Sequence, residues 1–499
     1  MQDSTLPPQV REFLSREQIG MVINGTSCPS VSGATAPVIN PSTGAILATL
    51  AKGDARDVEL AVHAARTAFD AGWARMLPGQ RESLLRRFAG LIEAHAEELA
   101  ILESLDNGKP IHHTMAIDAK ACAGNLYHAA GLPTKLVGTV PAVSIPGHFV
   151  YTRREPLGVV AVILPWNYPL IHAMQKAGPA LACGNTVVVK PASDASLAVV
   201  RLGELALEAG LPAGVFNVVT GPGSVIGDAL ASHPQVNKVQ MTGSTAVGKR
   251  VIAASAGNIK RLALELGSKA PNIIFDDADL SKAIPGAFDA AFGHSGQSCV
   301  AGCRLFVQRK VYDQVLEALI AMTGTVRAGN AMDNETTMGP IVSKTQFDTI
   351  MAYIEDGKAA GAKLECGGKR MMPPRVPEGG WYIEPTIFTA VPDDARISVE
   401  EIFGPVVNVY PFDTEEEVIA RANHSDYGLA SGVWTQNISR AHRVAHALNS
   451  GVVWINSYDK FQPTVPFGGF KQSGYGRDNG SSAVESFTEV KSVWVQVGV

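Results

Sequence analysis

Two cysteines close together in a glycine-rich segment are the first candidates for chemistry. The segment "GHSGQSCVAGC" contains Cys299 and Cys303, two of the six cysteines among 499 residues. No Cys-x-x-Cys pair and no cysteine–histidine cluster at zinc spacing occurs, so we expect no metal site. A disulfide framework is typical of small secreted chains. A cysteine nucleophile and a small buried side chain therefore remain as interpretations of Cys299.

Composition and charge narrow the class of protein before any motif is used. Hydrophobic residues make up 46% of the chain and charged residues 18%, which is typical of a globular protein with a large core. At about 150 residues per domain, the length predicts two or three domains. The formal net charge of −5 gives no electrostatic surface for nucleic acid or an anionic membrane. The start "MQDSTLPPQV" lacks the features of a signal peptide, so we expect a cytoplasmic protein.

Apolar periodicity predicts a helical start followed by alternating strands and helices. Residues 54–74 and 81–105 carry apolar side chains at three- and four-residue intervals, which predicts helices. Short apolar strands are expected at 158–164, 186–190, 215–220, 237–243 and 261–266, with helical stretches between them. This alternation indicates a parallel sheet covered on both faces. The pattern restarts at 272–275 and 303–307, which predicts a second α/β domain, and residues 486–497 read as a strand without an obvious local partner.

Four polar or glycine residues end these predicted strands, where parallel sheets bind ligands. They are Lys190, Thr220, Gly243 and Glu265. No G-x-G-x-x-G fingerprint is present, but Gly243 and Gly248 enclose a strand-to-helix turn. A helix N-terminus is an anion site, whereas glycine there also serves ordinary turn geometry. These residues alone leave a nucleotide site and a simple turn equally open.

Six sequence blocks, in one order, resemble the aldehyde dehydrogenase superfamily over nearly the whole chain. They are "PWNYP" (165–169), "MTGSTAVG" (241–248), "LELGSKAPNIIF" (264–275), "GQSCVAGCRLFV" (296–307), "EEIFGPV" (400–406) and "PFGGFKQSGYGRDNG" (466–480). The resemblance implies an α/β protein with a Rossmann-like dinucleotide-binding domain, a second α/β catalytic domain and a small β oligomerisation arm. The expected limits are 1–133 and 151–265 for the first, 266–470 for the second, and 134–150 and 478–499 for the arm.

The same resemblance implies the catalytic residues. Cys299 matches the family's nucleophile, Glu265 its general base, 34 residues earlier, and Asn167 a donor to the oxyanion hole. The implied reaction is oxidation of an aldehyde to a carboxylic acid through a thiohemiacetal and a thioester on the cysteine, with hydride transfer to NAD or NADP. Without the resemblance, Asn167 reads as a turn residue and Glu265 as the buried partner of a lysine.

The cofactor residues implied by the resemblance include one departure from the common pattern. They are Trp166, Lys190, Ser193, Gly223, Gly243, Ser244, Gly248, Glu401 and Phe403. Ser193 stands where the NAD-preferring majority has a glutamate that repels a 2′-phosphate, so NADP is admissible beside NAD. Asp194 is expected to point away from the cofactor. Ser268 and Asp478 are two further departures, where glycine and glutamate are commoner.

The resemblance also implies a substrate tunnel. Its residues would be Tyr168, His172, Gln175, Ser298, Val300, Ser457, Phe461 and Phe467. This set contains no charged side chain, which favours a neutral aldehyde of small to medium size. We expect a homodimer or homotetramer that binds neither nucleic acid nor membrane. A dehydrogenase that passes the thioester to CoA and a non-catalytic structural or binding relative remain as alternatives, and the set of Cys299, Glu265 and Asn167 argues against both.

Overall fold

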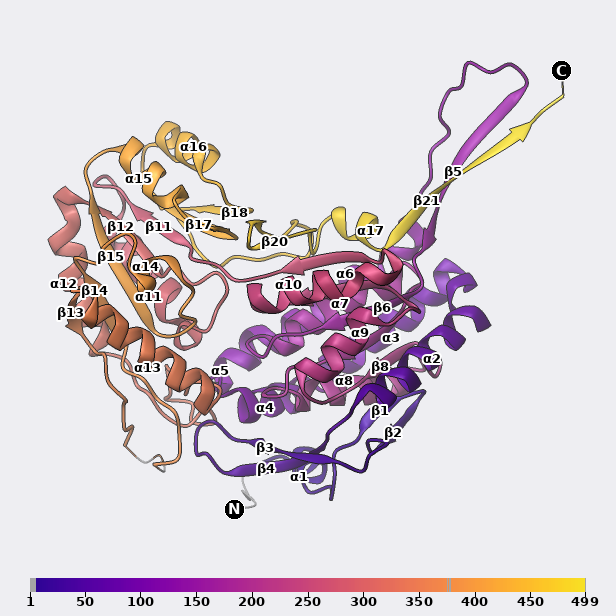
Figure 1. Cartoon of the computed structure of the whole chain (residues 1–499), viewed down its shortest axis with the longest axis horizontal. Coiled ribbons are helices and arrows are strands. Elements are labelled where there is room, and N and C mark those ends of the chain that lie inside the picture. The colour runs from indigo at the N-terminus through magenta and orange to yellow at the C-terminus, as the bar shows by residue number, and fades with distance from the viewer. Residues whose placement is uncertain (1–5, 375, 377, 499) are drawn as a thin grey trace.

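Two mainly parallel sheets, their helices and a projecting two-stranded arm make up the molecule (Figure 1). The computed structural model describes residues 6–374, 376 and 378–498. The prediction of an α/β fold is confirmed. Among the described residues, no helix combines the length and the apolar character that crossing a bilayer requires.

The first sheet has eight strands in the order β2-β1-β8-β7-β6-β9-β10-β20. Its parallel part consists of β6 (Val159–Ile163), β7 (Thr186–Lys190), β8 (Phe216–Val218), β9 (Val236–Thr242) and β10 (Arg261–Glu265). All five are among the strands expected from sequence, and most of their residues are buried. Ile163 pairs with Lys190 and Glu265 pairs with Thr242, so the carboxyl ends of these strands lie at one edge.

Helices cover both faces of the first sheet. They are α2 (Ala55–Ala71), α3 (Pro78–Ala94), α4 (Ala96–Asn107), α6 (Ala119–Ala130), α7 (Pro169–Ala182), α8 (Leu197–Glu208), α9 (Asp228–Ser232) and α10 (Thr245–Ala254). The helix expected over 81–105 is two helices, because the backbone leaves the helical conformation at His95. Gly108, in the left-handed conformation at φ 87°, ends the second of them.

The segment before the first long helix contains strands that the sequence analysis did not predict. After α1 (Pro8–Leu14), β1 (Met21–Ile23) and β2 (Thr26–Cys28) extend the first sheet, and β3 (Thr35–Ile39) pairs with β4 (Ile46–Ala51). At the opposite edge, the short β20 (Gly474–Tyr475) pairs with Leu264 and Glu265 of β10. The C-terminal part of the chain therefore returns to the first sheet beside a predicted catalytic residue.

The second sheet has seven strands in the order β13-β14-β15-β12-β11-β17-β18, parallel except for β13. The strands are β11 (Pro271–Ile274), β12 (Arg304–Gln308), β13 (Lys363–Cys366), β14 (Thr386–Thr389), β15 (Val406–Phe412), β17 (Ala430–Trp434) and β18 (Val452–Ile455). Its helices are α11 (Leu280–Phe292), α12 (Tyr312–Thr323), α13 (Lys344–Ala359), α14 (Arg396–Val399), α15 (Glu415–Asn423) and α16 (Ile438–Ala447). Two short strands, β16 (Tyr427–Gly428) and β19 (Phe470–Lys471), pair antiparallel as a separate two-stranded sheet.

The arm consists of β5 (His148–Pro156) and β21 (Thr488–Gln496), which project from the body in Figure 1. The two strands pair antiparallel over their full lengths, from Thr488 with Pro156 to Gln496 with His148. The C-terminal strand thus has a partner within its own chain, which its sequence alone did not reveal. Because β5 continues to Pro156, the arm sheet extends past residue 150, where the first arm segment was expected to end. The limits of the domains themselves stay a prediction.

Candidate active site

The turn that carries Cys299 lies just before β12 and is tightly fixed. Gln297 is fully buried, and its side-chain Oε1 accepts a hydrogen bond from Val342 N at 3.0 Å. Gly296 has φ 68°, and a Cβ there would lie 2.1 Å from Gly404 O, so only glycine permits this approach. The half-buried Cys299 is therefore presented from a rigid turn.

The environment of Cys299 favours the protonated thiol. Burial raises its pKa well above the usual range, and the charges of Glu401, Glu265 and Asp459 raise it further. A thiolate is the nucleophilic form of cysteine. A neighbouring base must therefore take the proton before Cys299 can attack a substrate.

Asn167 is held beside the nucleophile turn. Its side-chain Nδ2 donates to Gln297 O at 3.1 Å, and the residue is 2% exposed. Asn107, at the end of α4, donates from Nδ2 to Trp166 O at 2.5 Å and to Asn167 O at 3.4 Å, which fixes the loop. The second hydrogen of the Asn167 amide has no acceptor among the described residues. It is free to donate to an oxygen on a substrate bound at Cys299.

Glu265 ends β10 as a buried carboxyl group without a hydrogen-bond partner. The residue is 3% exposed, and its Oε2 is unpaired among the described residues. A Cβ at Gly468 would lie 2.7 Å from Oε1, so glycine makes room for this side chain. Burial raises the pKa of Glu265 well above its usual range, the charge of Asp478 adds to this, and Lys176 opposes it. A raised carboxyl pKa is what a general base near neutral pH requires.

A cavity of about 490 Å³ lies beside Cys299 and Asn167, which are part of its lining. Eight predicted cofactor residues also line it: Trp166, Lys190, Ser193, Gly223, Gly243, Ser244, Glu401 and Phe403. Gly248 does not line the cavity. A Cβ there would lie 2.6 Å from the side chain of Leu266, so Gly248 instead lets α10 pack closely on the end of β10.

One end of this cavity is suited to the phosphates and ribose of a dinucleotide. The N-terminus of α10 opens into it, and Ser244 caps that helix by accepting a hydrogen bond from Val247 N at 3.3 Å. Lys190 is 4% exposed, and its side-chain ammonium group makes no hydrogen bond or ion pair with the described residues. Burial lowers the pKa of Lys190 to about 8, and the charge of Asp194 opposes this. An unpaired buried ammonium group at a helix N-terminus fits an anionic or hydroxyl-rich ligand.

The other end of the cavity brings an aromatic pair and a carboxyl group near Cys299. The rings of Trp166 and Phe403 meet edge to face with centroids 5.1 Å apart. Glu401 accepts a hydrogen bond from Ser268 N at 2.8 Å, and burial raises the pKa of Glu401 to about 7. Gln346 donates to Phe403 O at 3.0 Å, which helps to hold Phe403 in its left-handed conformation at φ 56°.

Ser193 and Asp194 lie together on the cavity wall. The Ser193 hydroxyl donates to Gly221 O at 3.1 Å, which leaves its oxygen lone pairs available to accept. The expectation that Asp194 points away from the cofactor site is wrong, because Asp194 lines the cavity beside Ser193. The backbone turns after Lys190, so two consecutive residues can reach the same wall.

The predicted tunnel residues on α7 form a buried, hydrogen-bonded group. His172 Nδ1 and Gln175 Oε1 are 3.0 Å apart, and burial lowers the pKa of His172 to about 3, so this imidazole is neutral. The ring of Tyr168 meets that of His294 edge to face at 5.6 Å. Lys109 Nζ lies 3.8 Å from the Tyr168 ring centroid, a buried cation on an aromatic face that sequence reasoning did not find.

The predicted tunnel residues near the C-terminus differ in exposure. Phe461 is 48% exposed, and its ring contacts that of Phe467 at 5.3 Å. Phe467 and Val300 are instead buried in the core of the second sheet, whereas Ser298 and Ser457 are partly exposed. Two neighbours of Ser457 escaped sequence reasoning. Tyr458 donates to Val300 O at 2.8 Å, and the charge of Asp459 acts on both Tyr168 and Cys299.

The site combines a thiol, an amide donor, an unpaired carboxyl group and a large cavity, a set that fits an oxidoreductase of the nicotinamide class. The sequence profile of the Aldehyde dehydrogenase family matches residues 29–493. The chain belongs to the aldehyde dehydrogenase family. The predictions of this family and of an oxidoreductase that acts on aldehydes are therefore confirmed.

Individual relatives match this chain in sequence or structure over nearly its whole length. The chain is 47% identical to the putative aldehyde dehydrogenase DhaS of Bacillus subtilis, over 96% of this chain and 95% of that protein. It is 45% identical to a betaine aldehyde dehydrogenase of Mesorhizobium japonicum, over 95% and 97%. An aldehyde dehydrogenase from Bacillus cereus, solved as an NAD+ complex, superposes with a TM-score of 0.96 at 48% identity, over 99% of both chains. A nicotinamide cofactor is thus confirmed at the level of the family.

Proposed function

We propose that this chain oxidises an aldehyde to a carboxylic acid with NAD or NADP, through thiohemiacetal and thioester intermediates on Cys299. One observation carries the proposal: Cys299 lies at a dinucleotide-sized cavity with the Asn167 amide held beside it. Bound in that cavity, the nicotinamide would accept the hydride that the aldehyde carbon loses. All remaining steps fall to residues of the chain.

Glu265 would first take the proton of the buried thiol, and the Cys299 sulfur would then add to the carbonyl carbon. The carbonyl oxygen becomes negative as the carbon–sulfur bond forms. The Asn167 amide and the Cys299 backbone N–H would donate to it; the latter has no acceptor among the described residues. Fixed donors of this kind stabilise the developing charge without reorganising.

After hydride loss the thioester must be released. Glu265, unpaired and of raised pKa, would release the thiol proton to solvent and then take a proton from a water molecule, whose oxygen attacks the thioester carbon. The carbon–sulfur bond breaks, the acid leaves, and the thiol is restored. A carboxyl group poised for hydrolysis does not favour transfer to CoA, and the intact set of three residues does not favour a non-catalytic relative.

For cofactor choice, we propose that both NAD and NADP are accepted and that NAD is preferred. Ser193 removes the charge that excludes a 2′-phosphate, but its hydroxyl hydrogen is already donated to Gly221 O. Its oxygen therefore accepts from a ribose hydroxyl more readily than it donates to a phosphate. The carboxylate of Asp194 on the same wall also disfavours the extra phosphate charge.

For the substrate, we propose an aldehyde of small to medium size. Tyr168, Phe461 and the neutral His172 support an uncharged or aromatic substrate. Asp459 adds one acidic group that makes no hydrogen bond or ion pair with the described residues, so an aldehyde with a distal cation belongs in the test panel.

The arm supports assembly into a homodimer or homotetramer. Its strands and the residues that flank them expose large hydrophobic side chains: Val137, Val140, Ile145, Phe149, Val490, Trp494, Val495 and Val497. A monomer rarely leaves so much apolar surface on a projecting element. Light scattering at micromolar concentration tests the assembly, and a monomer would contradict it.

We propose a cytoplasmic location, which the six cysteines without disulfide partners support.

The central experiment is a set of turnover assays. Neutral, aromatic, carboxylated and cationic aldehydes would be tested with NAD and with NADP, with and without CoA, by absorbance of the reduced nicotinamide. We expect CoA-independent oxidation with both cofactors. Formation of an acyl-CoA product, or cofactor binding without reduction for any aldehyde, would overturn the proposal in favour of one of the two alternatives.

A further inference from the structure

The segment that carries the predicted tunnel side chains begins at a strongly held residue. Asn456 follows β18 in the left-handed conformation, with φ 52°. Its backbone N–H donates to Val433 O at 2.9 Å. Its side chain accepts from Thr435 N at 3.0 Å and donates to Thr435 O at 2.9 Å. The start of residues 456–461, which we call the tunnel segment, is thus held by these hydrogen bonds to the end of β17 and the residue that follows it.

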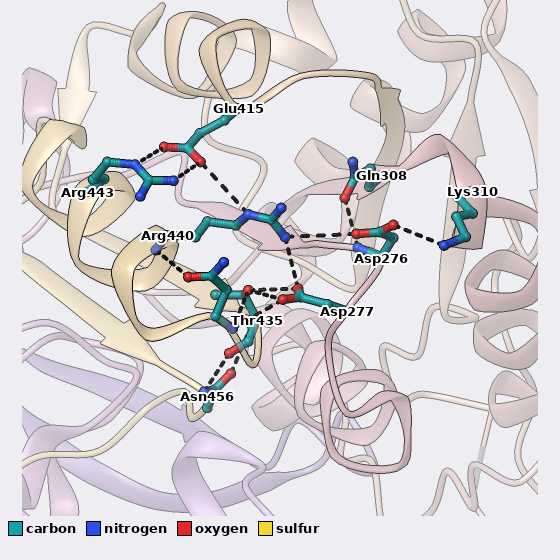
Figure 2. A network of polar contacts seen from close by, with 10 residues as sticks. Asp276, Asp277, Gln308, Lys310, Glu415, Thr435, Arg440, Arg443 and Asn456 are labelled. Atoms are coloured by element: carbon teal, nitrogen blue, oxygen red, sulfur yellow. Dashed lines mark hydrogen bonds and ion pairs between the residues drawn. The ribbon is translucent and has the colours of Figure 1, made fainter.

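Thr435 connects the hydrogen bonds of Asn456 to a charged network at the carboxyl edge of the second sheet (Figure 2). Its hydroxyl donates to Asp277, with oxygen distances of 2.7 and 2.9 Å, and Thr435 is 1% exposed. Arg440 of α16 donates to Asp277 Oδ1 at 3.0 Å, and its guanidinium lies 4.7 Å from the ring centroid of Phe275. Parallel sheets commonly bind ligands at this edge. Here the edge is filled by side chains that bond one another.

Further charged groups surround Arg440. Glu415 lies 3.8 Å from Arg440 Nε and forms a two-bond pair with Arg443, at 2.8 and 3.0 Å. Asp276 lies 3.8 Å from Arg440 and 3.3 Å from Lys310. Figure 2 shows these groups arranged around the Arg440 guanidinium. The network joins α15 and α16 to the ends of β11 and β17, so the position of Thr435 is set from several elements at once.

From Asn456 the tunnel segment turns back toward the nucleophile. Trp454 of β18 donates from Nε1 to Lys460 O at 3.0 Å, so the segment runs back along its own strand. The ring of Tyr458 lies against Gly432, where a Cβ would come within 2.6 Å of it. The Tyr458 hydroxyl then donates to Val300 O at 2.8 Å, on the residue directly after Cys299.

We propose that the contact chain Arg440–Asp277–Thr435–Asn456 positions the tunnel segment and, through Tyr458, the turn that carries Cys299. These residues make no contact with the cavity and are positioning residues. The inference rests on the proposed function for the role of Cys299, and its geometry is independent of which aldehyde is used.

The test compares two variants that delete single hydroxyl groups. Thr435→Val keeps the side-chain shape but removes the bond to Asp277 and the bond of 3.1 Å that the hydroxyl accepts from Asn437 N, and Tyr458→Phe removes only the bond to Val300. For each variant, the rate of alkylation of Cys299 by iodoacetamide is measured on the resting protein, with the modified cysteine identified by peptide mass spectrometry. The KM values for aldehyde and for NAD are measured beside it.

We expect both variants to change the alkylation rate and to raise the KM for aldehyde by about fivefold, the effect of one typical hydrogen bond. The KM for NAD should stay unchanged, and Thr435→Ser should restore both quantities. Arg309→Ala is the matched control, because Arg309 forms a two-bond pair with Asp413 at the same sheet edge, at 2.6 and 2.8 Å, without touching the tunnel segment. It should leave alkylation and both KM values unchanged.

Alkylation and aldehyde KM equal to wild type in Tyr458→Phe would overturn the proposal. A lowered melting temperature in Thr435→Val with normal alkylation would do the same, because it would reduce the network to a structural role. If Thr435→Val fails to fold, Tyr458→Phe decides alone. Failure of the proposed function would appear differently, as absence of turnover in the wild type, and the alkylation comparison would still test the positioning.

Discussion

Replacing Asn167 by alanine tests the proposed oxyanion donor most directly. The variant removes the N–H that has no acceptor among the described residues and the bond to Gln297 O, while Asn107 still holds the loop backbone through Trp166 O and through the carbonyl of residue 167. Loss of one fixed donor to a developing oxyanion typically lowers kcat by about 10²–10³. Leaving Gln297 O without its partner costs about 1–3 kcal/mol of folding stability. The loss of rate should therefore far exceed what the loss of stability explains.

Steady-state kinetics, NAD binding and thermal unfolding separate these two effects. The control is Thr414→Ala, which removes the N-cap of α15, a hydrogen bond of 3.2 Å from Glu417 N to the Thr414 hydroxyl. Loss of such a cap typically costs about 1 kcal/mol. This control should be destabilised to a similar degree and retain wild-type kcat. If Asn167→Ala keeps kcat within about tenfold of wild type, the side chain is not an oxyanion donor and the reasoning is wrong.

Three further predictions concern the nucleophile, the base and the cofactor. Cys299→Ala should abolish oxidation while cofactor still binds, whereas Cys303→Ala should turn over within a few-fold of wild type; the reverse pattern in activity assays would exchange their roles. In rapid-mixing experiments Glu265→Gln should give at most one equivalent of reduced cofactor and then stall as the thioester. Absence of a burst, with normal cofactor binding, would show that Glu265 is essential for deprotonating the Cys299 thiol, and continued turnover at the wild-type rate would contradict both of its proposed roles. Ser193→Glu should shift the ratio of kcat/KM toward NAD by about tenfold or more, since like charges about 4 Å apart cost about 4 kcal/mol at an effective dielectric of 20. An unchanged ratio would assign the choice to Asp194.

The elements that sequence predicted well are those with a strong local pattern. The strands β6 to β10 are short and mostly buried, so their length and their alternation with longer helical patterns distinguish them from the helices between them. The turn around Cys299 was found through a motif, and Gly296 shows why that motif needs glycine: its backbone meets Gly404 O. Such features leave a recognisable local sequence pattern, even where, as at Gly296, the physical reason is a contact with a distant residue.

The parts that sequence missed depend on contacts between distant residues. Asn107 and Trp166 are 59 positions apart, and nothing in either local pattern indicates their hydrogen bond. The two-residue strand β20 has no periodicity to detect, and β1 and β2 owe their place to pairing at a sheet edge. The direction of Asp194 follows from a backbone turn after Lys190, which composition does not encode. Side-chain direction within a loop is therefore the least predictable property of this site.

The relative position of base and nucleophile shows the same dependence. Glu265 belongs to the first sheet and Cys299 to a turn at the start of β12 in the second, so neither sheet alone sets the distance between them. The returning C-terminal segment joins the two parts: Gly474 pairs with Glu265, and Gly468 leaves room for its carboxyl group. Asp478 of the same segment forms a buried pair with Lys176 at 2.5 Å, and both charges act on the pKa of Glu265. The segment thus governs both the place and the protonation of the proposed base, although none of its residues takes part in the chemistry.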